Sequence, residues 1–220
     1  MEFQPKSPRA VAFDMDGTMF NTEDLYDEVG DILLQRRGFR FDRELKLKMM
    51  GLPGAVAFQV MREHHQLDDP IEQLQTETRE IFADLLPGQI EAMPGLFELL
   101  DFLEKRNIPK CVATSSHRQF ASTALGTFEL EDRFEFVLTA EDVESGKPHP
   151  EIYFTAANRF GIDATQMLVL EDSFTGSTAA VAAGALTIAV PTEHSRGVDF
   201  SHVHSIAGSL NDEVIFELLQ

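Results

Sequence analysis

Residues 10–18 read AVAFDMDGT, and the rest of the chain is organised around this stretch. The apolar run 10–13 is typical of a short buried strand, and turn formers follow it directly. Asp14 and Asp16 therefore stand where a central strand of an α/β sheet would end, the usual place for a ligand crevice. Two unpaired carboxylates so close together would repel each other and would be costly to bury. The pair implies a cation, a shared proton or a reacting group, or else it belongs to a solvated turn.

The composition limits the class of protein. The chain has 220 residues, 43% of them hydrophobic, which suits one domain or a larger domain that carries a smaller one. The net charge of −19 and the lack of a basic patch disfavour nucleic acid as a partner. The single cysteine, Cys111, excludes an internal disulfide and suits a reducing compartment. No apolar run approaches the ~18 residues of a membrane span, and no signal-peptide core begins the sequence. We therefore expect a cytoplasmic monomer without a membrane partner.

Residues 20–92 show helical periodicity only. Apolar residues recur at helical spacing over 23–37, 55–65 and 71–85. The Asp69-Pro70 pair predicts that Asp69 is the N-cap of the last of these helices, and Pro87-Gly88 predicts its end. A stretch of this length is far too long for a structureless loop, so we expect a separate all-α domain.

From residue 93 onward strands alternate with helices. The expected strands are 108–113, 134–139, 167–170 and 186–190, and the expected helices are 94–103, 117–128, 148–160, 174–183 and 211–219. This alternation predicts a parallel sheet that is covered by helices on both faces. We expect an α/β, doubly wound core made of residues 1–19 and 93–220, with the helical domain 20–92 inserted after the first strand.

Polar side chains follow four of the expected strands. They are Asp14 and Asp16, Thr114 and Ser115, Lys147 a little beyond its strand, and Glu171 and Asp172. Because parallel strands end at the same edge of a sheet, we expect these groups to converge. Several acids, a hydroxyl and a lysine around one crevice are typical of a metal-assisted phosphoryl-transfer site.

Four motifs of the chain closely resemble those of the haloacid dehalogenase superfamily of phosphohydrolases. They are DMDGT at 14–18, ATSS at 113–116, SGKPHPEIY at 145–153 and LEDSFTGSTAAVAAG at 170–184. The resemblance spans essentially the whole chain and is to the subgroup of β-phosphoglucomutases, sugar phosphatases and phosphoglycolate phosphatases. It implies a Rossmann-like core with a helical cap over residues 20–92.

The resemblance also implies a role for each matched residue in the reaction. Asp14 would be the nucleophile that becomes an aspartyl-phosphate. Asp16 would be the general acid for the leaving oxygen and then the base that activates water. Thr114, Ser115 and Lys147 would hold the transferring phosphoryl group. A covalent intermediate of this kind divides a very slow hydrolysis into two easier steps.

A Mg²⁺ site is implied by the same resemblance. Asp172 would bind the ion together with Asp14 and the backbone carbonyl of Asp16, and Glu171 would lie beside it. Physical chemistry asks for such an ion independently, because a carboxylate cannot approach a phosphate dianion without charge neutralisation. A hard cation with oxygen ligands supplies that neutralisation.

The reaction class depends on a few positions. Members of the superfamily that are true dehalogenases lack an acid at the Asp16 position, so Asp16 favours an alcohol leaving group and hence a phosphate monoester. The alternative is a phosphomutase of the β-phosphoglucomutase type. That family carries a histidine where this chain has Tyr26 and an arginine where it has Gly54, and neither replacement can do the same work. We therefore expect a phosphatase of a small phosphorylated metabolite: a sugar, nucleoside or glycolate-type phosphate.

Substrate specificity is expected to lie in the helical domain, which would contact the leaving group. The candidate contacts are Glu23, Tyr26, Met50, Gly51 and Leu52.

Three further residues with reactive or charged side chains allow other interpretations. Cys111 and Arg118 are too far apart for a cysteine-phosphatase loop, so Cys111 is expected in the core. His117 is equally compatible with a substrate contact and with a helix start. Glu77 is expected on a solvated helix face.

Overall fold

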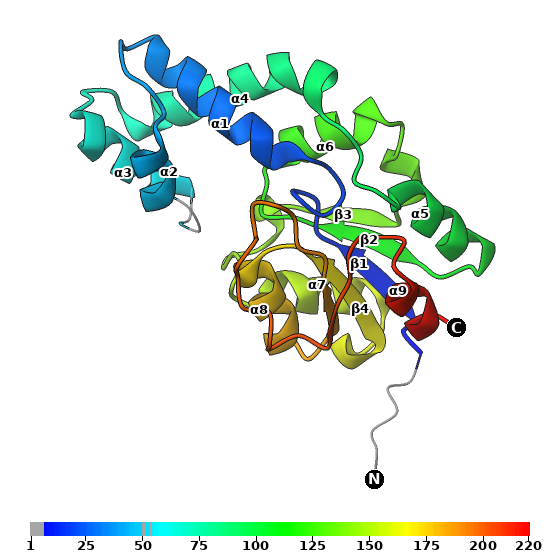
Figure 1. The fold of residues 1–220 in the computed structure, drawn as a ribbon. Coiled ribbons are helices and arrows are strands. Elements are labelled where there is room, and N and C mark those ends of the chain that lie inside the picture. Colours follow the sequence, from blue (N-terminus) through cyan, green and yellow to red (C-terminus); the bar gives the residue numbers. More distant parts are fainter. Residues whose placement is uncertain (1–6, 50–51, 53) are drawn as a thin grey trace. The chain divides into compact units, whose positions relative to one another are not determined.

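A computed structural model describes residues 7–49, 52 and 54–220. The chain divides into two compact units, one made of Met1–Asn21 with Glu91–Gln220 and the other of Thr22–Ile90 (Figure 1). The first unit is therefore built from two segments of the chain, and the second is a continuous insertion. Among the described residues, no helix combines the length and the apolarity that crossing a membrane requires.

The first unit contains a six-stranded sheet in the order β3-β2-β1-β4-β5-β6. Its strands are β1 (Ala10–Phe13), β2 (Lys110–Ala113), β3 (Phe136–Leu138), β4 (Met167–Glu171), β5 (Leu186–Ala189) and β6 (Ser205–Ile206). Every pairing is parallel, and Ala12 of β1 lies between Cys111 of β2 and Val169 of β4. The residues that follow β1 thus emerge between the carboxyl ends of two neighbouring strands.

The strand order explains how the helices are distributed over the sheet. They are α5 (Leu96–Lys105), α6 (Arg118–Thr127), α7 (Glu151–Phe160), α8 (Phe174–Ala182) and α9 (Glu213–Leu218). The chain moves outward from β1 through β2 to β3, then returns to the other side of β1 through β4 and β5. Since crossover connections are right-handed, this reversal puts α5 and α6 on one face and α7 and α8 on the other (Figure 1). The doubly wound α/β fold class predicted from the sequence is confirmed, and the reversal at β1 marks the place where ligands bind in such sheets.

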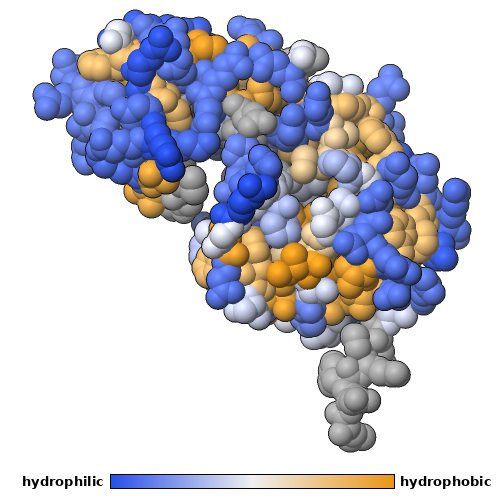
Figure 2. All heavy atoms as spheres, viewed as in Figure 1, coloured by the Kyte–Doolittle hydropathy of each residue, from blue (hydrophilic) through white to orange (hydrophobic). Residues whose placement is uncertain are grey.

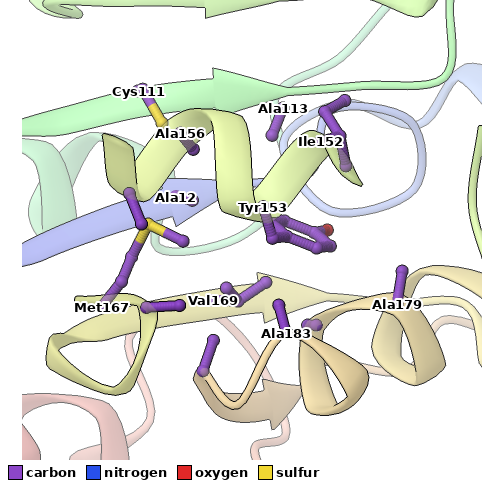
Figure 3. Packing of buried hydrophobic residues seen from close by; sticks show 14 of the residues in the cluster. Ala12, Cys111, Ala113, Ile152, Tyr153, Ala156, Met167, Val169, Ala179 and Ala183 are labelled. Carbon is purple, nitrogen blue, oxygen red and sulfur yellow. The ribbon is translucent and has the colours of Figure 1, made fainter. Parts of the chain in front are cut away.

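Small side chains let α7 and α8 lie close to the sheet. The buried cluster on this face includes Ala156 of α7, Ala179 of α8 and Ala183 directly after α8, which pack with Ala12 and Val169 of the strands (Figure 3). Alanine carries little side-chain volume, so the helix backbones approach the strands closely, and the close packing is favourable.

The second unit is all-helical. Its helices are α1 (Thr22–Gln35), α2 (Arg43–Met49), α3 (Gly54–His65) and α4 (Ile71–Gln89). The apolar stripe of α1, with Leu25, Val29 and Leu33, is buried, as are Leu74 and Leu86 of α4. These stripes follow the helical periodicity of the sequence. Whether this unit serves as a cap remains a prediction.

Several local expectations are wrong. Asp69 is not the N-cap of α4; Pro70 takes that position with no side-chain cap, and Asp69 accepts hydrogen bonds from Arg37 instead. Glu77, expected on a solvated face, is only 20% exposed at its side chain and pairs with the same arginine. The helix also continues past Pro87 to Gln89. Its last turn keeps a hydrogen bond from the Ile90 N–H to the Leu86 carbonyl, 3.2 Å. The two-residue strand β6 was not expected, because so short a segment has no periodicity to detect.

Candidate active site

Asp14 follows β1 directly and is buried at the strand end. Its backbone N–H donates to the Leu170 carbonyl of β4, 2.9 Å, which continues the sheet pairing by one residue and fixes the position of the side chain. The carboxylate oxygen Oδ1 accepts a hydrogen bond from Lys147 Nζ at 2.6 Å. The strand end therefore presents one carboxylate that is already paired with a buried cation.

Lys147 uses all three of its ammonium hydrogens within this unit. Besides Asp14, Nζ donates to the Ala113 carbonyl at the end of β2, 2.9 Å, and to Glu171 Oε1 at the end of β4, 2.7 Å. A lysine ammonium has three donors and no acceptor, so its hydrogen-bonding capacity is filled. Lys147 thus links the carboxyl ends of β1, β2 and β4 through one atom.

Glu171 is fully buried and is held by four donors. Oε1 accepts from Lys147 and from the Tyr153 hydroxyl, 2.9 Å, while Oε2 accepts from the Ser173 backbone N–H, 3.1 Å, and from Ser173 Oγ, 2.9 Å. The four bonds match the roughly four acceptor positions of a carboxylate. Gly176, in the first turn of α8, leaves the necessary space, because a Cβ there would overlap the Glu171 carboxylate.

Asp172 completes a group of three acidic side chains. Asp14, Glu171 and Asp172 each offer a carboxylate oxygen, and these oxygens lie within 4.8 Å of one another. Gly17 makes room for Asp172, because its φ of 81° favours glycine and a Cβ would overlap the Asp172 carboxylate. The donor set is oxygen only, and two of the three carboxylates, Asp14 and Glu171, share the Lys147 ammonium. Such a site fits a hard divalent cation.

Asp16 lies half-buried and is directed toward the end of β2. Its Oδ2 accepts from Thr114 Oγ1, 3.1 Å, and from Ser116 Oγ, 2.7 Å. Thr114 Oγ1 in turn accepts from the Ser116 backbone N–H, 2.9 Å. The two acids of the DMDGT motif therefore have different partners: a buried lysine for Asp14 and two hydroxyls for Asp16.

Burial dominates the electrostatics of the site. It raises the pKa of Asp14 well above its ordinary value, although the Lys147 charge acts in the opposite direction. Burial lowers the pKa of Lys147, but the charges of Asp14 and Glu171 outweigh it and hold the pKa well above its usual range. Burial and the Glu171 charge also raise the pKa of Tyr153, so its hydroxyl keeps its proton and remains a donor. A divalent cation would favour the charged form of Asp14.

The three predicted phosphate-binding residues lie together at the same edge of the sheet. Thr114, Ser115 and Lys147 line a pocket together with the loop that follows β3. Thr114 is fully buried and Ser115 is exposed. The first unit thus brings all seven predicted core residues to the carboxyl ends of its strands.

The predicted cap contacts are placed only in part. Tyr26 is 43% exposed and packs edge to face against Phe82 of α4, with ring centroids 4.7 Å apart. Leu52 is also exposed. Met50, Gly51 and the side chain of Glu23 lie outside the described part of the structure.

The other reactive residues do not join the site. Cys111 is fully buried in β2, where burial raises the pKa of its thiol, and Arg118 pairs with Asp142 at 2.8 Å. His117 precedes α6, and its Nδ1 lies 3.1 Å from Glu141 Oε1. A cysteine-phosphatase loop is therefore absent from this part of the chain.

Four residues of the site were not assigned from the sequence: Ser116, Tyr153, Ser173 and Gly176. All four stand inside the quoted motifs. Motif membership was the available signal, but it does not show which side chain meets which.

Comparisons with known proteins bear on the family and the fold of the chain. A family model described as haloacid dehalogenase-like hydrolase matches residues 11–190. The chain is 36% identical to (DL)-glycerol-3-phosphatase 2 of Arabidopsis thaliana over 87% of this chain and 82% of that one. It is 31% identical to the phosphorylated carbohydrates phosphatase of Thermotoga maritima, over 80% and 81%. The crystal structure of CbbY from Rhodobacter sphaeroides in complex with phosphate has the same fold, with a TM-score of 0.83, 24% identity, and coverage of 92% of this chain and 95% of that one.

Proposed function

Since the chain belongs to the family of haloacid dehalogenase-like hydrolases, we propose that it is a Mg²⁺-dependent phosphatase that hydrolyses a small organic phosphate monoester. The observation that carries the proposal is the position of Asp14, held by Lys147 at 2.6 Å and within 4.8 Å of a second and third carboxylate. A nucleophile, a cation for the phosphoryl oxygens and a metal-binding group thus meet at one strand end. Phosphoryl transfer needs little else beyond positioning and charge.

The first step of the proposed reaction forms a bond between an Asp14 carboxylate oxygen and phosphorus. The bond between phosphorus and the ester oxygen breaks, and Asp16 gives its proton to that oxygen, so the alcohol leaves neutral. Thr114, Ser115 and Lys147 would orient the phosphoryl oxygens. Because every hydrogen of Lys147 is already used, the arriving phosphoryl group must take over one of its three bonds.

The second step releases phosphate. Asp16, now a carboxylate, takes a proton from water as the water oxygen attacks phosphorus, and the bond to Asp14 breaks. The hydroxyls of Thr114 and Ser116 fix Asp16 for both proton transfers, at 3.1 and 2.7 Å. The enzyme returns to its starting state with Asp16 protonated.

The donor chemistry of the site fits Mg²⁺. Asp14, Asp172 and the Asp16 carbonyl would hold the ion, as the family resemblance implies. When bound, it supplies the positive charge that lets a carboxylate approach a phosphate dianion. Glu171 would stay beside the ion without contacting it directly, because its acceptor positions are filled by protein donors.

The substrate class follows from the relatives. Two of them are phosphatases whose names give glycerol 3-phosphate and phosphorylated carbohydrates as substrates. We propose a polyol or sugar phosphate first, and a nucleoside or glycolate-type phosphate next. Residues 20–92 would act as the cap, with Glu23, Tyr26, Gly51 and Leu52 among the contacts to the leaving group. The monomeric state and the cytoplasmic location remain predictions.

A phosphomutase is the second candidate, and one observation weighs against it. Gly54 begins α3 and carries no side chain at the position where the mutases have an arginine. This position therefore supplies no cation to grip a second phosphate. Without that grip, water should take the phosphoryl group from Asp14 before a sugar hydroxyl does.

The test is phosphate release by the purified protein from polyol, sugar, nucleoside and glycolate-type phosphates, with Mg²⁺ and with EDTA. We expect turnover of at least one ester with Mg²⁺ and none with EDTA. Turnover of no ester, or full activity in EDTA, would contradict the proposal. Glucose 6-phosphate forming from β-glucose 1-phosphate faster than free phosphate, with the 1,6-bisphosphate present, would favour the mutase.

A further inference from the structure

Tyr153 is a fully buried polar side chain with no role in the chemistry described above. It lies in the first turn of α7, and its ring packs in the cluster between this helix and the sheet (Figure 3). Its hydroxyl points toward the carboxyl ends of the strands (Figure 3). A phenylalanine would fill the same space without a polar atom to satisfy. Packing alone therefore does not explain a hydroxyl at this position.

The hydroxyl begins a short series of contacts that ends at Asp14. It donates to Glu171 Oε1 at 2.9 Å, the same oxygen that accepts from Lys147 Nζ at 2.7 Å. Nζ in turn donates to Asp14 Oδ1 at 2.6 Å. The Tyr153 ring makes a second contact with this series, because Lys147 Nζ lies over its face, 5.2 Å from the centroid.

We propose that Tyr153 is a positioning residue, which holds Glu171 Oε1 so that the Lys147 ammonium stays fixed against Asp14. The proposal rests on the proposed function, in which Asp14 is the nucleophile. Oε2 of Glu171 is already fixed by Ser173, so the Tyr153 hydroxyl decides the direction of the other oxygen. Without it, Oε1 keeps only its lysine partner, and the carboxylate and ammonium can move together away from Asp14.

The first test compares Y153F with a matched loss of a buried hydroxyl, T187V. Thr187 is fully buried in β5, and its hydroxyl donates to the Ala185 carbonyl at 3.1 Å, away from the site. We expect Y153F to lower kcat by about tenfold, the effect of one hydrogen bond to a charged group. KM and the Mg²⁺ concentration for half-maximal activity should change by less than about twofold, because Tyr153 is fully buried and is not among the residues proposed to bind substrate or Mg²⁺. T187V should keep kcat. A Y153F kcat within about twofold of wild type, or an equal loss in T187V, would overturn the proposal.

A second test does not depend on activity. Lys147 is buried with all its hydrogens bonded, so its ammonium should give a solvent-protected signal in ¹H–¹⁵N spectra of lysine-labelled protein. The signal is assigned by its loss in K147M. It should shift in Y153F and not in T187V. An unmoved signal in Y153F would show that the hydroxyl does not position the lysine.

The two proposals, that the protein is a phosphatase and that Tyr153 positions Lys147, can fail separately. If wild type hydrolyses no phosphate ester, the phosphatase proposal is wrong, while the lysine signal still reports on the contact. If Y153F does not fold, 3-fluorotyrosine can replace the chain's two tyrosines, with Y26F used only to assign the signals. The ¹⁹F signal of Tyr153 should then move in E171Q. A signal that stays in place would contradict the contact and the proposal with it.

Discussion

Arg37 offers a quantitative prediction for the all-helical unit. It lies in the turn that follows α1 and forms a two-bond pair with Glu77 of α4, 2.8 and 3.0 Å, and a further pair with Asp69, 2.7 and 3.1 Å. Its side chain is 12% exposed, and that of Glu77 is 20% exposed. Removing the guanidinium with R37M takes the hydrogen-bonded cation away from two partly buried carboxylates, and only the more distant Arg36 remains beside Glu77, at 3.7 Å. We therefore expect a large loss of stability from this single change.

The pKa of Glu77 gives the magnitude. Hydrogen bonds from Arg37, with a further one from Gln73, lower this pKa from 4.5 to about 2. A difference of that size corresponds to about 3 kcal/mol at neutral pH, and partial exposure reduces it, so we expect a loss of about 1–3 kcal/mol. Arg36 is the matched control. It is 50% exposed and reaches the same Glu77 through a single contact of 3.7 Å, so R36M should cost less than about 0.5 kcal/mol.

The pH dependence has a definite sign. A carboxyl group with a depressed folded pKa stabilises the fold above its unfolded pKa, and it loses that contribution as the pH falls toward the folded value. The difference between wild type and R37M should therefore shrink by about half or more between pH 7 and pH 3. Urea unfolding followed by far-UV circular dichroism measures it, and hydrogen exchange of residues 22–90 localises it. A loss no larger in R37M than in R36M, or a difference that grows in acid, would refute the reasoning.

Three further predictions concern the first unit. D14N should lower phosphate release by a factor on the order of 10⁶, because the proposed nucleophile is lost; more than about a hundredth of wild-type activity would exclude Asp14 from that role. Chelation should abolish activity and Mg²⁺ should restore it, while D172A should raise the Mg²⁺ concentration needed, as a titration of the rate against Mg²⁺ would show. G176A should lower kcat by about 10² in the phosphate-release assay, because the new Cβ would overlap the Glu171 carboxylate. G126A, at an open position of α6, should keep wild-type activity.

The elements that could be predicted from the sequence are those encoded by neighbouring residues. The strand 10–13 and the helix ends at Gly161 and Gly184 are examples. Both glycines have positive φ, 67° and 80°, which glycine adopts without strain, so a helix that meets one tends to end there. In the same way, the polar residues that follow the predicted strands identified the acids, the hydroxyls and the lysine as candidate site residues. These residues could also be placed at one edge of the sheet, because the carboxyl ends of parallel strands lie at the same edge.

The partners within the site and within the helical unit could not be predicted, because they depend on contacts far apart in the sequence. Arg37 meets Asp69 and Glu77 across 32 and 40 positions, so neither acid could be recognised as paired from its own helix. The Ser116–Asp16 bond spans 100 positions. Hydrophobic periodicity indicates which face of a helix or strand is buried, but it does not indicate which distant residue supplies the hydrogen-bond partner of a polar side chain.

The buried contacts of Glu171 also explain why the site depends on more residues than those that touch substrate. A carboxylate in a fully buried place is stable only if its oxygens are satisfied, and here a lysine, a tyrosine and a serine do this together. The same lysine holds the proposed nucleophile. The same hydrogen bonds of Lys147 therefore satisfy the buried Glu171 carboxylate and align Asp14. This coupling explains why a helix of the core, α7, contributes a hydroxyl to a site whose other hydrogen-bonding side chains come from strand ends and loops.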